Sequence, residues 1–166
     1  MSLSAKDQHL LDDLFFKDGS EPRYITHKAS EGEAKAIQLF ESGKRGEAIS
    51  EIDVLINQFP ETASLYNNRA QMFRIMGRDE EARKDLYRGL EQNPDEYIKM
   101  KINEQLGWLE FKENNLEKAQ THFKLAAEIG SREARRMQIR CNPYAELCNA
   151  MFREALSQSC YSFKSE

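Results

Sequence analysis

Small residues recur along this 166-residue chain at intervals that indicate a stack of similar units. Ala36, Ala70 and Gly107 follow one another at spacings of 34 and then 37 residues. Three more columns repeat the same two intervals: Ala48, Ala82 and Ala119; Ile52, Leu86 and Phe123; and Leu55, Gly89 and Ala126. Four columns in one register predict an array of three equivalent units, with a three-residue insertion near residues 95–100.

Each unit is predicted to be a pair of helices joined by a tight turn. The stretch 66–94, YNNRAQMFRIMGRDEEARKDLYRGLEQNP, contains a helical stretch, Gly77, a second helical stretch and Pro94. Glycine and proline interrupt helices, so these two residues mark the turn and the end of the unit. Ser30 and Glu33 have the spacing of a capping box ahead of the first unit. Asp79 is predicted to cap the helix that follows Gly77.

This combination of period and small positions resembles the tetratricopeptide repeat, whose units are about 34 residues long. The resemblance implies an all-α superhelix of three helix hairpins, at residues 29–62, 63–96 and 97–130. A capping helix and an amphipathic helix are expected over 131–158, and a frayed tail over 159–166. Glu110 stands where a large apolar residue is expected, which predicts that the long helix over 95–113 is rotated.

The two ends of the array carry an apolar and a basic segment. Residues 1–28 are predicted to hold a short apolar helix at 10–16 and a flexible link. This helix either packs on its own chain or docks on another protein. At the other end, Arg132, Arg136 and Arg140 share one face of a short helix. That face is either a solvated cover for the last unit or a docking site for an acidic partner.

An amphipathic C-terminal helix is predicted after the basic one. Asn142 suits the cap position and Pro143 the first helical position. Apolar residues then recur at helical spacing from Tyr144 to Ala155. Cys148 lies on that apolar stripe, so it is predicted to be a buried structural thiol rather than a reactive one.

Two short stretches of sequence resemble one particular family among the tetratricopeptide repeat proteins. YNNRAQ in the second unit and NPYAELCNAM after the basic helix, together with the insertion before the third unit, resemble the tetratricopeptide repeat protein 36 family over roughly residues 33–156. The resemblance implies a small non-enzymatic adaptor that is linked to heat-shock chaperones and to the control of tyrosine breakdown. Its partners are then other proteins, either a heat-shock chaperone or a client enzyme.

Composition argues against several other classes of protein. The formal net charge of −4 disfavours nucleic acid as a partner, and no apolar run reaches the ~18 residues of a membrane span. The start of the sequence has no pattern of a secretory signal. Neither a catalytic motif nor a metal-ligand spacing is found, and no cofactor is expected. Three irregularly spaced cysteines indicate reduced thiols, and therefore a protein of the cytoplasm or nucleus. The protein is expected to be a monomer.

The concave face of such a superhelix is lined by the first helix of each unit. The resemblance implies a further comparison. Repeats of this kind that bind chaperones use five groove residues to clamp a terminal carboxylate through charge-assisted hydrogen bonds. Asn68 and Lys101 match two of these positions. Glu33, Ile37 and Gln105 replace a lysine, an asparagine and an arginine. A carboxylate clamp is therefore disfavoured.

The alternative is an apolar groove. Four large apolar residues fall on groove-facing positions, with Gln71 and Arg74 between them: Ile37, Phe40, Trp108 and Phe111. A groove of this kind suits an amphipathic helix of a partner. Trp108 fits the groove and the core equally well, whereas Phe40 and Phe111 are expected in the core.

The sequence thus predicts a cytoplasmic, non-enzymatic adaptor or co-chaperone that binds proteins through its concave groove. The alternative is a structural scaffold subunit of a stable complex, with the groove closed by the chain's own N-terminal segment. A molecular mass that rises with concentration would favour the scaffold, and a monomer that captures peptides would favour the adaptor.

Overall fold

The computed structural model describes residues 30–142 together with Tyr144 and Met151. This part of the chain contains no strand and seven α-helices, namely α2 (Glu31–Glu41), α3 (Arg45–Gln58), α4 (Ala63–Ile75), α5 (Asp79–Glu91), α6 (Glu96–Lys112), α7 (Leu116–Ile129) and α8 (Arg132–Arg140). The all-α prediction is confirmed. The apolar segment at 10–16, Cys148 and most of the predicted C-terminal helix lie outside the described residues.

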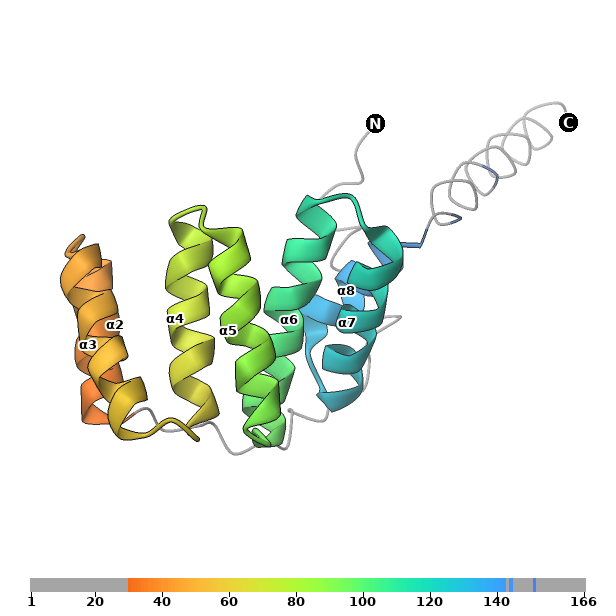
Figure 1. Ribbon diagram of the computed structural model, residues 1–166. Helices are drawn as coiled ribbons and strands as arrows, with labels where there is room; N and C mark the ends of the chain where they lie inside the picture. Colours follow the sequence, from red (N-terminus) through yellow and green to blue (C-terminus); the bar gives the residue numbers. More distant parts are fainter. Residues whose placement is uncertain (1–29, 143, 145–150, 152–166) are drawn as a thin grey trace, which may run out of the picture.

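The helices form three antiparallel pairs stacked side by side (Figure 1). α2 packs on α3, α4 on α5 and α6 on α7, and among the described helices the main contacts of each pair outside itself are with its neighbours along the stack. α8 covers α7 at the end of the array. Within residues 30–142 no helix is both long and apolar enough to cross a membrane.

Side chains at the starts of α2, α6 and α8 satisfy backbone N–H groups that the helix leaves unpaired; at α8, Ser131 Oγ accepts the Ala134 N–H at 3.0 Å. The predicted capping box is confirmed: the Ser30 N–H donates to Glu33 Oε2 at 2.8 Å, and the Glu33 N–H donates to Ser30 Oγ at 3.3 Å. Asp95 caps α6 by accepting the Ile98 N–H at 2.8 Å.

The predicted cap at Asp79 is wrong, because the helix starts one residue earlier than expected. Arg78 occupies the cap position of α5 without a side-chain hydrogen bond, and Asp79 is the first helical residue. The Asp79 carboxylate accepts instead from Lys112 Nζ of α6 at 2.5 Å. It also lies in the first turn, where a negative charge is favoured by the helix dipole.

The turns inside the three pairs use one backbone conformation at equivalent positions. Gly43, Gly77 and Asn114 have φ values of 86°, 75° and 61°, and they follow one another at the repeat spacing. Glycine enters this left-handed region at the lowest cost, and asparagine is among the few other residues that do so. The repeat therefore extends to the turns as well as to the helix faces.

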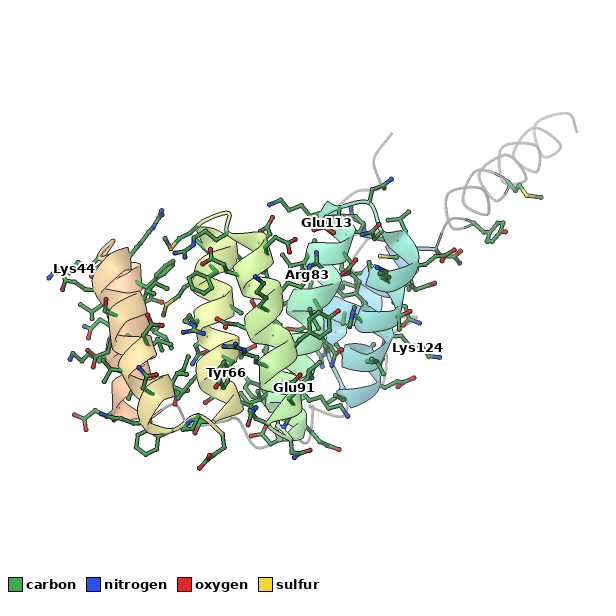
Figure 2. All side chains as sticks on the ribbon, viewed as in Figure 1. Lys44, Tyr66, Arg83, Glu91, Glu113 and Lys124 are labelled. Atoms are coloured by element: carbon green, nitrogen blue, oxygen red, sulfur yellow. The ribbon has the colours of Figure 1, made fainter. Side chains whose placement is uncertain are left out.

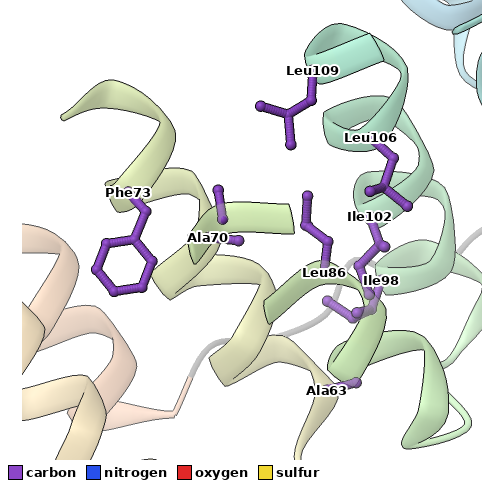
Figure 3. Close-up of a cluster of buried hydrophobic side chains, with 9 residues drawn as sticks. Ala63, Ala70, Phe73, Leu86, Ile98, Ile102, Leu106 and Leu109 are labelled. Atoms are coloured by element: carbon purple, nitrogen blue, oxygen red, sulfur yellow. The ribbon is translucent and has the colours of Figure 1, made fainter. Parts of the chain in front are cut away.

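The apolar core lies between successive helix pairs. Figure 3 shows the central cluster, which α4, α5 and α6 build from residues that include Phe73, Leu86 and Ile102. Similar clusters join α2 and α3 to α4, and α6 to α7 and α8. Ala36, Ala70 and Gly107 are all buried, which lets the paired helices approach closely.

Buried charge pairs also join neighbouring helices. Arg69 of α4 donates through Nε and Nη2 to both carboxylate oxygens of Asp85 on α5, each at 2.7 Å. Its Nη1 donates to Asp53 Oδ1 on α3 at 2.6 Å. One guanidinium thus connects the first helix pair to the second. Hydrogen bonds to both carboxylates raise the pKa of Arg69.

Glu110 disproves the predicted rotation of α6. It is 3% exposed, and its counterpart Phe73 is 6% exposed, so both helices bury the same face. Its carboxylate is bonded by Arg83 Nη1 of α5 and, at 3.0 Å, by Asn115 Nδ2. Arg83 Nη2 donates to Glu113 at 2.6 Å (Figure 2). A paired carboxylate therefore takes the place of an apolar residue without turning the helix.

We predict that Gly107→Ala lowers the free energy of unfolding by about 1–3 kcal/mol, because a Cβ at Gly107 would lie 2.7 Å from the ring of Phe123. Phe123 is fully buried, so its ring could move only by disturbing the surrounding core. Gly46→Ala in α3 is the matched control, since a Cβ there meets no atom within 4 Å. Urea unfolding followed by circular dichroism measures both, and equal stabilities of the two variants would contradict the close approach.

Candidate functional site

A pocket of about 330 Å³ lies between α4 and α6, the first helices of the second and third pairs. Four side chains of α4 and four of α6 line it: Asn67, Gln71, Arg74, Ile75, Lys101, Glu104, Gln105 and Trp108. The pocket opens on the groove that the sequence predicts from the repeat.

The pocket brings together part of the predicted groove set. Five of the predicted residues line it, namely Gln71, Arg74, Lys101, Gln105 and Trp108. Three others do not line it: Asn68 lies on α4, whereas Glu33 and Ile37 lie on α2 of the first pair. The predicted set missed Asn67, Ile75 and Glu104. Asn67 and Glu104 are repeat equivalents of Glu33, so the register contained a signal that would have identified them.

A chain of hydrogen bonds joins the first helices of all three pairs. Asn68 Nδ2 of α4 donates to Glu33 Oε1 of α2 at 3.1 Å, and Asn67 Nδ2 lies 3.4 Å from Asn68 Oδ1. Gln105 Nε2 of α6 donates to Asn67 Oδ1 at 2.9 Å and to the Asn67 carbonyl at 3.1 Å. Arg74 Nη1 lies 3.5 Å from Gln105 Oε1. These contacts hold the concave side of the stack in register.

Glu33 is part of the framework rather than of an open surface. Its side chain is 2% exposed, and its two carboxylate oxygens accept from the Ser30 backbone and from Asn68. In the clamp that the sequence disfavours, Asn68 would instead donate to a ligand. Here the chain's own carboxylate takes that hydrogen bond.

The second clamp-like residue, Lys101, is also engaged by its own helix. Lys101 Nζ lies 2.9 Å from Glu104 Oε2 and 5.9 Å from the centre of the Tyr97 ring. The other oxygen of Glu104 accepts from the Ser131 hydroxyl at the start of α8. The charge of Lys101 is thus neutralised on the pocket wall.

Arg74 is the pocket cation that has no carboxylate partner among the described residues. Its guanidinium is half-buried, and this burial lowers the pKa of Arg74, an effect that the more distant Asp79 charge partly offsets. Arginine stays protonated even so. The pocket therefore presents a positive charge to which no carboxylate of the described residues is bonded.

Trp108 belongs to both the core and the pocket. Its ring meets Phe111 and Phe123 edge-on, with centroids 5.9 and 5.7 Å apart, while part of the ring lines the pocket. Phe40 and Phe111 are partly buried against core clusters, as is Ile37. Ile75, which is 55% exposed, adds a second apolar wall. The apolar part of the site is therefore smaller than the sequence predicts.

The basic helix α8 lies apart from the pocket lining. Its Ala134 and Met137 are buried against α7, whereas Arg132, Arg136 and Arg140 are exposed. The three arginines thus face outward from the end of the stack. Among the residues that the structure describes, no group of histidine, cysteine or acidic side chains is arranged to hold a metal ion.

Comparisons with known proteins identify the repeat and its relatives. The tetratricopeptide repeat family model matches residues 63–96. The tetratricopeptide repeat protein 36 homolog of Drosophila melanogaster is 39% identical over 95% of this chain and 96% of the relative. Tetratricopeptide repeat protein 36 of Danio rerio is 30% identical over 92% of this chain and 80% of the relative. That of Homo sapiens is 34% identical over 76% of this chain and 67% of the relative.

Solved structures share the architecture. The first tetratricopeptide repeat domain of Spaghetti (RPAP3), bound to the HSP90 peptide SRMEEVD, has a TM-score of 0.60 and 22% identity over 70% of this chain and 95% of that one. The type III secretion translocator chaperone SycD of Yersinia enterocolitica has a TM-score of 0.55 and 16% identity over 76% and 90%. At these identities the likeness concerns the fold alone.

We predict that Glu33→Ala lowers the free energy of unfolding by about 1–3 kcal/mol, because it removes the capping box and the acceptor of Asn68. Glu31→Ala, in the same first turn at an exposed position, is the control and should change stability little. Thermal unfolding of the two variants measures the difference. Equal melting temperatures would show that the Glu33 carboxylate does not join α2 to α4.

Proposed function

The chain belongs to the tetratricopeptide repeat protein 36 family, and we propose that it is an adaptor that holds partner proteins in the pocket between α4 and α6. The observation that carries the proposal is the composition of that pocket. It combines an uncompensated arginine, Arg74, with the apolar surfaces of Trp108 and Ile75 and several amides. Mixed polar and apolar walls of this kind suit a peptide segment better than a small apolar ligand.

A heat-shock chaperone is the first partner class to test. The Spaghetti domain has a related fold and was solved with an HSP90 peptide, and the family resemblance implies a link to chaperones. The mode of contact should differ from a carboxylate clamp. Asn68 and Lys101, the two residues that match the clamp, already bond to Glu33 and Glu104.

A client enzyme is the other partner that the family resemblance implies, through its link with tyrosine breakdown. Such a client would use the same pocket, with the adaptor as a monomer in the cytoplasm. Sedimentation at rising concentrations tests the monomer, and a mass that increases would favour the scaffold alternative.

We predict that the protein binds intact HSP90 and also HSP90 from which the acidic C-terminal tail has been removed. Trp108→Ala should weaken this binding about tenfold or more. Trp108 is the one aromatic residue among those that line the pocket, and aromatic residues often dominate binding energy. Titration calorimetry of wild type and variants measures the affinities. Asn68→Ala should bind as wild type does, because Asn68 is already used within the chain.

Two controls separate loss of contact from loss of fold. Tyr87→Ala on α5 removes an exposed aromatic side chain outside the pocket and should leave affinity unchanged. Ile75→Ser changes a pocket residue that is 55% exposed, so it should weaken binding with little loss of stability. If tail removal and Asn68→Ala both abolish binding, the protein uses a carboxylate clamp and the proposed contact is wrong.

A further inference from the structure

Three arginines on α4 and α5 are largely shielded from water. They differ in whether a carboxylate bonds to the guanidinium. Arg69 is 15% exposed and bonds to Asp85 and Asp53. Arg83 is 17% exposed and bonds to Glu110 and Glu113. Arg74 is half-buried too, yet its only described hydrogen-bond contact is a 3.5 Å approach to the Gln105 amide.

A shielded charge without a counter-charge is costly, so its retention calls for an explanation. The carboxylates near Arg74 are committed to other groups. Asp79 pairs with Lys112, and Glu104 accepts from Lys101 and from Ser131. No carboxylate of the described chain is thus available to the guanidinium, which faces the α4–α6 pocket.

We propose that Arg74 binds an aspartate or glutamate side chain within a partner's polypeptide, and that an apolar residue beside that acid packs between Ile75 and Trp108. This inference rests on the proposed function and specifies the chemistry of the segment bound. The planar guanidinium matches a carboxylate through two parallel hydrogen bonds. Ile75 and Trp108 supply the adjoining apolar walls of the same pocket.

The pocket favours an internal acidic residue over two other anions. A free chain end would need further donors, but Asn68 and Lys101 are held by Glu33 and Glu104. A phosphate group carries close to two negative charges and would meet the Glu104 carboxylate on the pocket wall. One carboxylate matches the single positive charge that is left without a partner.

Selection from a random peptide library tests the inference without a known partner. Peptides of about 12 residues, displayed between fixed flanking sequences so that no chain end is free, are selected against the wild-type protein. We expect enriched sequences to share an aspartate or glutamate close to a large apolar residue. An enriched set without acidic residues would overturn the inference.

The strongest peptide is then synthesised with a blocked C-terminus, and its affinity is measured by fluorescence polarisation. Arg74→Gln should weaken binding about tenfold, the loss typical of a charge-assisted pair. Changing the acidic residue of the peptide to its amide should weaken binding to the wild-type protein by a similar factor. The same change should leave binding to Arg74→Gln unaffected. Arg74→Glu should prefer the same peptide with lysine in place of the acid. Arg88→Gln, an exposed arginine on α5 outside the pocket, should bind as wild type does.

The outcomes separate the inference from the function on which it rests. If selected peptides need Ile75 but bind Arg74→Gln as tightly as wild type, the carboxylate assignment is wrong while the pocket remains a binding site. If no selected peptide depends on Ile75, the pocket itself is not the binding site, and both proposals fail. Thermal unfolding of Arg74→Gln controls for stability, and we expect no loss since no ion pair of the described chain is removed.

Discussion

The close approach of paired helices is the constraint on which this array depends. Among the described helices, the main contacts of each pair are with its neighbours in the stack, so the fit within a pair depends on its own residues. Ala36, Ala70 and Gly107 meet this constraint by removing side-chain bulk where the helices cross. At Gly107 the gain is visible, because the ring of Phe123 occupies the space that a Cβ would need. The helix spacing within the pairs thus follows from the smallest residues in the sequence.

The stacking of one pair on the next is determined by polar groups as well as by the core. Arg69 joins α3, α4 and α5, Arg83 joins α5 to α6, and Gln105 joins α6 to α4. Buried charges need partners of defined geometry, so they select one arrangement more strictly than apolar contacts do. The pocket between α4 and α6 is built on this arrangement, since Gln105 and Asn67, which bond the two helices, line it together with Arg74 and Trp108.

The sequence predicted local features well because local patterns determine them. The helix pairs and the capping box at Ser30 follow from periodicity and from spacings of a few residues. Contacts between distant residues were harder to predict. Glu110 was interpreted as a misfit, since nothing in its neighbourhood shows that Arg83, 27 residues earlier, neutralises it. Likewise, five pocket residues were predicted from the register, but the bond of Glu33 to Asn68 required coordinates.

Departures from the repeat carry more information about function than the repeat itself. Arg74 is the repeat equivalent of Phe40 and Phe111, which pack against core clusters in the first and third pairs. The same backbone position therefore holds an aromatic ring twice and a positive charge once. Because a ring there would add to the core, the arginine gives up apolar burial that its equivalents obtain. Glu110 also replaces an apolar residue, but Arg83 and Asn115 satisfy it within the chain. Arg74 has no such internal compensation among the described residues, and this difference separates a structural substitution from one that points to a partner.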